Sequence, residues 1–237
     1  MVNFLSAIAA NSSLCVTRTK VCPYSSRSLK KADYSGKVLH EKVRYEILRR
    51  FGYFVTESSQ HFAEYVPWFI KQNRQDLIDQ YEIPIDIYID RCERNNKYWE
   101  KMNLLMNEPL ERSNEYASYI MDAISNNNEV TINANVKNNN LIDNLPDDCC
   151  VEVPCVINSD GCKPQKIGRL PEHLAALMRT NINVQLLTAE AAITKKREHI
   201  YHAAMLDPLT AANLSIDEIY SMTDKLIEAH GDYLKFN

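Results

Sequence analysis

The stretch VTINANV, residues 130–136, alternates apolar and polar side chains with a period of two, which predicts a half-buried β-strand. A second strand-like stretch, CVEVPCVI, follows at residues 150–157. Pro154 lies inside it and has no backbone N–H, so we expect an edge or a bulge there. A turn signal follows at residues 159–161, and residues 163–168 are expected to return as the second arm of a hairpin.

Helical patterns lie on both sides of these strands. Before them, apolar residues recur at helical spacing over residues 36–51, 74–81, 85–107 and 113–125. After them, residues 172–230 are mostly helical, with an interruption at Pro208 and a new start at Ser215. This order of helices, a small antiparallel sheet and further helices predicts an α+β fold that is mostly helical.

The composition argues against several functional classes. The 237 residues carry a formal net charge of -4, which argues against a general nucleic-acid binder. No run of about eighteen apolar residues occurs, so the sequence predicts no transmembrane helix and no membrane partner. The five glycines are scattered and form neither a G-x-G-x-x-G motif nor a P-loop, so we expect no nucleotide-binding loop in this chain.

The chain has seven cysteines, an odd number with two of them adjacent at positions 149 and 150. This pattern favours a reducing cytoplasm over a disulfide framework. The cluster from Cys149 to Cys162 lacks the paired C-x-x-C spacing of zinc sites, so we expect buried structural thiols. We interpret His199 and His202 as a structural or surface pair and His230 as a cation at a helix end.

Residues 1–32 differ in composition from the rest of the chain. They hold five basic residues, six serines and no acid. Such a segment resembles a transit peptide, or it is a divergent segment with no targeting role. We favour the second interpretation.

Residues 56–69 combine hydroxyls, a histidine, two acids and four aromatic rings. Sugar sites need this mixture, because aromatic faces cover the C–H surface of a sugar while polar groups bind its hydroxyls. A buried aromatic turn is the alternative interpretation.

These residues also carry a resemblance to a known family. The stretch GYFVTESSQHFAEY, residues 52–65, preceded by Tyr45 and Glu46, is similar to the family 4 glycoside hydrolases, and most to their α-galactosidase branch. Further similar stretches are LIDNLP (141–146), CCVEVP (149–154), RTNINVQ (179–185) and YHAAMLDP (201–208). The resemblance implies the C-terminal domain of these enzymes, which is like that of lactate and malate dehydrogenases.

The resemblance implies hydrolysis of α-galactosides with NAD and Mn²⁺ as cofactors. In such enzymes NAD⁺ oxidises C3 of the sugar, the metal polarises the product, and a base removes the acidified C2 proton before the aglycone leaves. Other branches of the family act on α-glucosides or α-glucuronides. The dinucleotide fold and the metal ligands belong to an N-terminal half that we do not find in this sequence, so we expect neither cofactor to bind this chain alone.

The resemblance divides the chain at about residue 40. Residues 1–39 are expected to be divergent and poorly ordered, and residues 40–237 to form a substrate and oligomerisation domain. We expect a homo-oligomer or a pairing with the missing half, and no activity from the chain alone. Two other hypotheses stay open: a catalytically silent module that acts in assembly, and one half of a split enzyme.

The resemblance places the helix 41–51 at the catalytic site and implies a base on it. Glu46 and Tyr45 are the candidates, with Glu46 slightly ahead; adjacent helical residues point about 100° apart, so only one of them can face the sugar. A surface glutamate and a core tyrosine are the alternatives. The candidates for binding the sugar are Arg44, His61, Arg179, Asn181 and Asn183. For Arg44 a surface position is the alternative, and for the two asparagines a helix-capping role.

Overall fold

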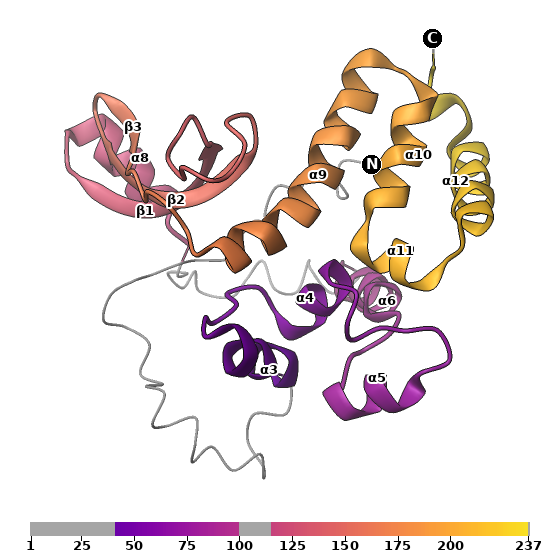
Figure 1. Cartoon of the computed structure of the whole chain (residues 1–237). Coiled ribbons are helices and arrows are strands. Elements are labelled where there is room, and N and C mark those ends of the chain that lie inside the picture. Colours follow the sequence, from indigo (N-terminus) through magenta and orange to yellow (C-terminus); the bar gives the residue numbers. More distant parts are fainter. Residues whose placement is uncertain (1–40, 100–114, 237) are drawn as a thin grey trace.

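The computed structural model describes residues 41–99 and 115–236 of the chain (Figure 1). The helices before the sheet are α3 (Lys42–Phe51), α4 (Ser59–Tyr65), α5 (Gln75–Tyr81), α6 (Ile87–Trp99) and α8 (Ala117–Asn126). The helices after it are α9 (Glu172–Thr194), α10 (Arg197–Leu206), α11 (Pro208–Asn213), α12 (Ile216–His230) and the short 3₁₀ helix η1 (Gly231–Tyr233). The predictions for residues 1–39, for 36–40 of the first helix and for 100–107 lie outside the described residues.

The strands β1 (Val130–Lys137), β2 (Cys150–Asn158) and β3 (Gly161–Pro164) form an antiparallel sheet in the order β1-β2-β3. The predicted strands at 130–136 and 150–157 are therefore confirmed, and so is the α+β order of elements. Alternate residues of β2 are buried, so one face of the sheet lies against the core.

The third strand ends earlier than predicted. It covers Gly161–Pro164 rather than 163–168. The backbone N–H groups of Ile167 and Gly168 donate to the carbonyl of Leu141 instead, at 2.9 and 3.0 Å. The chain therefore leaves β2 to pair with the loop that follows β1.

Pro154 lies at the point where β3 has ended. The N–H of Gln165 donates to the Pro154 carbonyl at 2.8 Å, just beyond the Cys155–Pro164 pair that closes β3. The N and O of a strand residue point to the same side, so the missing N–H of Pro154 faces the side of β2 on which β3 has already ended. The predicted edge strand or bulge is wrong, because β2 is the central strand and pairs with β1 through Pro154 in an unbroken register.

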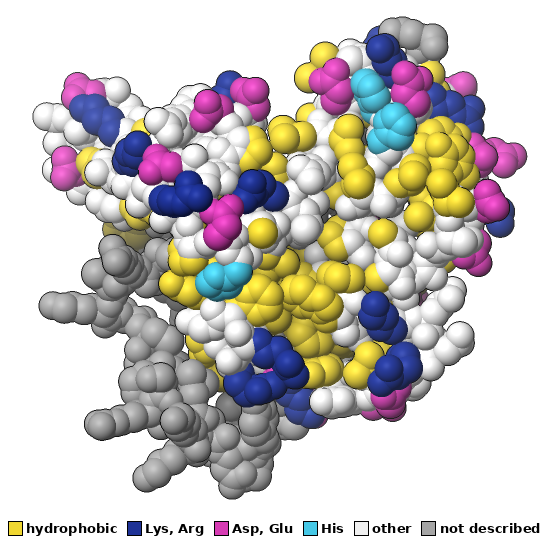
Figure 2. Space-filling view, in the orientation of Figure 1, with side chains coloured by type: hydrophobic (Ala, Val, Ile, Leu, Met, Phe, Trp, Pro, Cys, Tyr) yellow, Lys and Arg dark blue, Asp and Glu magenta, His cyan; other side chains and the backbone are white. Residues whose placement is uncertain are grey.

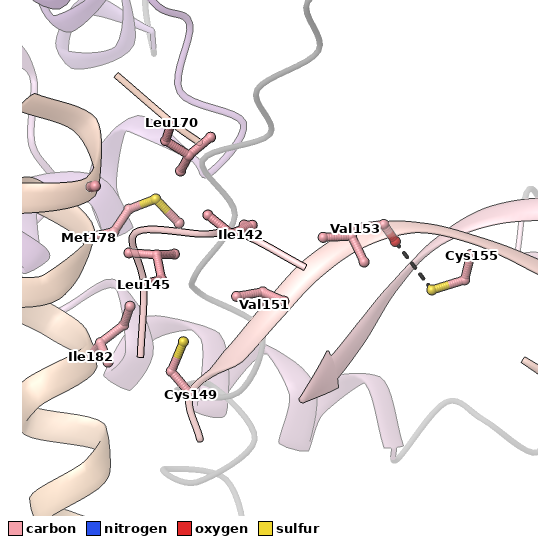
Figure 3. Packing of buried hydrophobic residues seen from close by; sticks show 10 residues of the cluster. Ile142, Leu145, Cys149, Val151, Val153, Cys155, Leu170, Met178 and Ile182 are labelled. Atoms are coloured by element: carbon pink, nitrogen blue, oxygen red, sulfur yellow. Dashed lines mark hydrogen bonds between the residues drawn. The ribbon is translucent and has the colours of Figure 1, made fainter. Parts of the chain in front are cut away.

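One hydrophobic core joins the sheet to α9. It contains Val151 and Val153 of β2, Ile142 of the loop between β1 and β2, and Met178 and Ile182 of α9 (Figure 3). The loop between β1 and β2 therefore packs between the sheet and α9.

A second core joins α3 and α4 to the same helix. Val43 and Ile47 of α3, Phe62 and Ala63 of α4, and Leu177 of α9 are all buried in it. Figure 1 shows α9 running from the sheet towards α10, above α3 and α4. Because α9 contributes to both cores, it fixes α3 relative to the sheet.

Local signals in the sequence explain where the helices begin and end. Gly52 adopts the left-handed conformation (φ 76°) and its N–H donates to the carbonyl of Leu48, so it ends α3. Ser58 caps α4 by accepting a hydrogen bond from the N–H of His61. Ser215 begins α12 with a reciprocal capping box. Among the described residues, no helix has the length and apolar character needed to cross a membrane.

Candidate active site on helix α3

One side of helix α3 is buried in the protein, and the other side is at least partly exposed to solvent. Val43 and Ile47 are 0% and 2% exposed, and they face the second core. Tyr45 and Glu46 lie between these positions and are half-buried. The structure therefore places both candidate bases beside, rather than inside, the packed face of α3.

Glu46 is held by two arginines from the last turn of its own helix. Arg49 donates to both carboxylate oxygens at 2.9 and 2.6 Å, and Arg50 donates to one of them at 2.5 Å. The side chain is only 13% exposed. The hydrogen bonds from Arg49 and then Arg50 outweigh the desolvation and lower the pKa of Glu46 to about 2. The carboxylate is therefore a weak base with most of its acceptor positions occupied.

Tyr45 lies against the loop that follows α3. Its ring meets the ring of Phe54 edge-on, with centroids 6.1 Å apart. The guanidinium of Arg44 lies over the same Phe54 ring, 4.3 Å from its centroid. Phe54 therefore links the two neighbouring residues of α3.

Arg44 is clamped rather than lying free on the surface. Its Nε donates to the carbonyl of Val55 at 2.8 Å, and one terminal nitrogen donates to Glu41 at 2.8 Å. The hydroxyl of Ser59 donates to the other oxygen of Glu41 at 3.2 Å. This network ties the start of α3 to the loop 53–58 and to the first residue of α4, which carry part of the predicted sugar-binding stretch.

The other candidate residues lie on α4 and α9 and have local partners. The His61 ring nitrogen is 3.3 Å from the Glu64 carboxylate. Arg179 donates to Glu172 at 2.7 Å, within α9. Each of these side chains remains partly exposed.

Asn181 joins two of the elements that carry candidate residues. Its side-chain nitrogen donates to the carbonyl of Tyr65 at 3.2 Å, at the C-terminal end of α4. This contact agrees with the capping alternative, because the last carbonyls of a helix lack partners inside the helix. Asn183 lies two residues further along α9 and is exposed. The structure thus brings Arg44, His61 and Asn181 onto adjoining elements, whereas Arg179 pairs within α9.

An aromatic cluster at the junction of α3, α4 and α9 was not predicted. Phe51 lies 5.5 Å from Trp68 and 5.8 Å from His173, and Tyr53 lies 5.9 Å from His173, between ring centroids. The His173 Nε2 is 3.1 Å from the Phe51 carbonyl oxygen. Figure 2 shows hydrophobic side chains gathered on this face over α4, between α9 and α3. The richness in aromatic residues was visible in the sequence, but the contact with His173, about 120 residues away, was not.

Asn138 is a second residue that the sequence did not single out. It is 0% exposed and donates to the carbonyls of Ile142, Leu145 and Pro146 at 3.0–3.1 Å. Its side-chain oxygen accepts from the N–H of Ile142 at 2.8 Å. Asn138 therefore organises the loop between β1 and β2, although it stands in a run of three asparagines typical of exposed loops.

The described residues do not fit a metal or dinucleotide site. No group of three His, Cys, Asp or Glu side chains that could hold a metal occurs among them. Cys149 and Cys155 are buried, and burial raises the pKa of each thiol to about 11, so both stay protonated and are poor ligands. The glycines with positive φ, at positions 52, 161, 168 and 231, lie at separate turns.

The cysteines that the structure describes are unbridged, and two of the histidines have partners within or beside their own helices. The five cysteines that the structure describes are free thiols. The prediction of buried thiols holds for Cys149 and Cys155 but is wrong for Cys162, which is exposed because β3 is a short edge strand. His199 hydrogen-bonds the hydroxyl of Thr194, and His230 binds the Leu226 carbonyl in the last turn of α12.

Comparison with known proteins identifies the family. Residues 8–210 match the model of the family 4 glycosyl hydrolase C-terminal domain. An α-galactosidase of Bacillus subtilis is 51% identical over 199 residues, which cover 82% of this chain and 46% of that enzyme. An α-galactosidase of Rhizobium meliloti is 32% identical over 206 residues, which cover 82% of this chain and 42% of that enzyme. The chain thus spans less than half the length of these relatives.

Solved structures agree on the fold. A putative glucosidase from Bacillus subtilis superposes with a TM-score of 0.66 at 21% identity, over 78% of this chain and 42% of that one. A 6-phospho-α-glucosidase from gut microorganisms, in complex with NAD and Mn²⁺, superposes with a TM-score of 0.60 at 18% identity, over 81% and 43%. The resemblance inferred from the motifs is confirmed, and the chain belongs to the family 4 glycosyl hydrolases, matching their C-terminal domain.

Proposed function

We propose that this chain supplies the C-terminal half of an NAD- and Mn²⁺-dependent α-galactosidase that acts on small α-galactosides. The observation that carries this proposal is the 51% identity to an α-galactosidase. A maltose-6'-phosphate glucosidase of Fusobacterium mortiferum is 33% identical, and over only 123 residues. The higher identity over a longer stretch supports a galactoside over a phosphorylated glucoside.

The proposed contribution of this chain is a proton acceptor and part of the sugar site. Between the two candidate bases, we place Tyr45 first. The carboxylate oxygens of Glu46 already accept hydrogen bonds from Arg49 and Arg50. In addition, a carboxylate with a pKa of about 2 has little affinity for a proton near neutral pH. Glu46 would then orient the end of α3 while Tyr45 faces the sugar.

The sugar itself would be bound by the polar residues on the adjoining elements. His61 and Asn183 are at least partly exposed and can reach hydroxyls directly. Arg44 and Asn181 act through the loop 53–58 and the end of α4, because their side-chain nitrogens already donate to the backbone carbonyls of Val55 and Tyr65. Arg179 pairs with Glu172 but remains a candidate because its side chain is partly exposed.

The cofactors would be held by a separate half of the enzyme. The described residues contain no group of metal ligands and no closely spaced glycines at a helix N-terminus, which a pyrophosphate site needs. We propose that NAD and Mn²⁺ bind a preceding domain, as a fused half or as a second chain, and that the assembly is a cytoplasmic homo-oligomer.

Substitutions at the two candidate bases test the assignment. Residues 40–237 are fused behind the preceding half of the Bacillus subtilis relative, and Tyr45→Phe and Glu46→Gln are compared for turnover of a nitrophenyl α-galactoside. Tyr45→Phe should lower turnover by about 10²–10⁴-fold and suppress exchange of the C2 proton with D₂O. Glu46→Gln should keep measurable exchange. The reverse pattern would make Glu46 the base.

A further inference from the structure

Phe54 contacts both the candidate base Tyr45 and the neighbouring Arg44. Its ring meets the ring of Tyr45 edge-on, with centroids 6.1 Å apart and planes at 64°. The guanidinium of Arg44 lies over the same ring, 4.3 Å from its centroid. Phe54 belongs to the loop 53–58 between α3 and α4. A loop residue therefore lies against the side chain that we propose as the proton acceptor.

The packing of α3 fixes the backbone of Tyr45 but not its side chain. Val43 and Ile47, two residues before and after Tyr45, are buried in the second core. Tyr45 itself is half-buried. A side chain can adopt several staggered rotamers on one backbone, and a proton acceptor works only within reach of the proton that it removes. The orientation of the Tyr45 ring therefore depends on the side chains beside it.

Arg44 holds the Phe54 ring through the next residue of the loop. Its Nε donates to the carbonyl of Val55 at 2.8 Å, and the side chain of Val55 is buried in the second core. A terminal nitrogen of Arg44 donates to Glu41 at 2.8 Å, so the cation is paired. A guanidinium that is hydrogen-bonded and also lies over an aromatic face restricts the movement of that ring. The ring of Phe54 is thereby held against Tyr45.

We propose that Phe54 is a positioning residue for Tyr45, and that Arg44 acts on the reaction through Phe54 rather than by touching the sugar. The centroid distance lies within the range that edge-to-face aromatic pairs prefer, so the Phe54 ring favours one orientation of the Tyr45 ring. This role rests on the assignment of Tyr45 as the proton acceptor. It makes the loop 53–58 a determinant of the rate of proton removal.

Replacing the Phe54 ring tests the positioning, in residues 40–237 fused behind the preceding half of the Bacillus subtilis relative. Leucine is apolar but has no ring, so Phe54→Leu should lower the kcat for a nitrophenyl α-galactoside by about 10–100-fold with KM nearly unchanged. Exchange of the C2 proton with D₂O should fall by a similar factor. Phe54→Tyr keeps a ring and should restore most of both rates. Unchanged rates with leucine, or equally low rates with tyrosine, would overturn the proposal.

A matched variant separates positioning from a general loss of packing. Tyr220 of α12 stacks on Tyr201 of α10 with centroids 4.6 Å apart, away from α3 in Figure 1. Tyr220→Leu likewise replaces one ring of an aromatic pair, and it should leave kcat and proton exchange at the parental values. Urea unfolding checks that each variant is folded under the assay conditions. An equal fall in kcat in the Phe54 and Tyr220 variants would reduce Phe54 to a packing role.

A double-mutant cycle tests whether Phe54 acts through Tyr45. Tyr45→Phe keeps the ring but removes the oxygen that would accept the proton. In this background Phe54→Leu should lower the remaining turnover by less than about twofold, because the group that it positions is already absent. A further fall as large as in the parent would show that Phe54 acts elsewhere and would overturn the proposal.

The variant Arg44→Lys separates an action through Phe54 from direct binding of the sugar. Lysine keeps the charge but cannot form the same fork of hydrogen bonds to Val55 and Glu41. We expect a lower kcat with KM nearly unchanged. A higher KM with an unchanged kcat would contradict this role and assign Arg44 to the sugar.

These variants also distinguish the proton acceptor from its positioning. Full turnover by Tyr45→Phe would remove Tyr45 as the base, and the role of Phe54 with it. Loss of turnover in Tyr45→Phe without any loss in Phe54→Leu would leave the base assignment intact and overturn only the positioning.

Discussion

At the scale of single residues, Glu46 illustrates how the neighbours of a side chain limit its chemistry. The family resemblance implies an acid six residues before Gly52, and this favours Glu46 as a base. Arg49 and Arg50 lie three and four residues after Glu46 and donate hydrogen bonds to its carboxylate, which weakens it as a base. The spacing of these arginines was visible in the sequence, but the burial that strengthens the contacts was not.

The ion pairs of Glu46 predict a particular dependence of stability on pH. The folded-state pKa, about 2, lies below the usual 4.5, so the stabilisation is complete above pH 4.5 and is lost as pH falls towards 2. Urea unfolding at pH 6, 4 and 3 should show the free-energy difference between the wild type and Glu46→Gln shrinking as pH falls. An equal difference at all three pH values would mean that the carboxylate is not held as described.

The cysteines should differ in reactivity according to their burial. Cys92 and Cys162 are exposed, whereas burial raises the pKa of Cys149 and Cys155 to about 11. Thiolate is the reactive form, so Ellman's reagent at pH 8 should modify the exposed pair much faster.

The denatured chain gives the reference for this measurement. Without reductant, all seven thiols should titrate after unfolding, which extends the prediction to Cys15 and Cys22. Fewer than seven would indicate a disulfide. As a control, a Cys92→Ser/Cys162→Ser variant in its native state should lack the fast phase of the reaction with Ellman's reagent.

At the scale of secondary-structure elements, local patterns predicted most of the fold. The alternation in residues 130–136 and 150–157 predicted β1 and β2, and Ser215 predicted the start of α12, because these signals act over a few residues. The end of β3 was missed because it depends on a competing contact with Leu141. Helix α8 begins at Ala117, later than the predicted Ser113.

Contacts over long sequence distances could not be predicted. Arg44 donates a hydrogen bond to the carbonyl of Val55, and the aromatic cluster is completed by His173 on α9. Nothing in the local sequence marks these pairings, because they follow from how α9 packs between two cores. The candidate site could therefore be located on α3 and residues 56–69, while the partners of each side chain required the structure.

The loop between β1 and β2 depends on one buried side chain. Asn138→Ala would remove the side-chain donor from three carbonyls and the acceptor of the Ile142 N–H, although the carbonyls of Ile142 and Pro146 keep weaker backbone contacts at 3.3 Å. We expect a loss of roughly 2–4 kcal/mol in the free energy of unfolding, measured with urea. Asn135→Ala, at an exposed position of β1, should change it by less than about 0.5 kcal/mol. Equal effects would show that Asn138 does not organise the loop.

At the scale of the whole molecule, the described residues provide a candidate sugar-facing helix and lack a fitting site for the cofactors. Helix α3 carries Tyr45 and Glu46 and is fixed by packing against α4 and α9. The chain covers 46% of the length of the Bacillus subtilis relative. These observations support the proposal that hydrolysis of the galactoside requires an assembly of two halves rather than residues 1–237 alone.

The most direct test is turnover of a nitrophenyl α-galactoside with NAD⁺ and Mn²⁺, measured for residues 1–237 alone and for residues 40–237 fused behind the preceding half of the Bacillus subtilis relative. The account predicts hydrolysis by the fusion, and neither hydrolysis nor saturable NAD⁺ binding by the chain alone. Turnover or micromolar NAD⁺ affinity of the pure chain would contradict the division into halves. A folded fusion that binds NAD⁺ without turnover would instead make this chain a catalytically silent module.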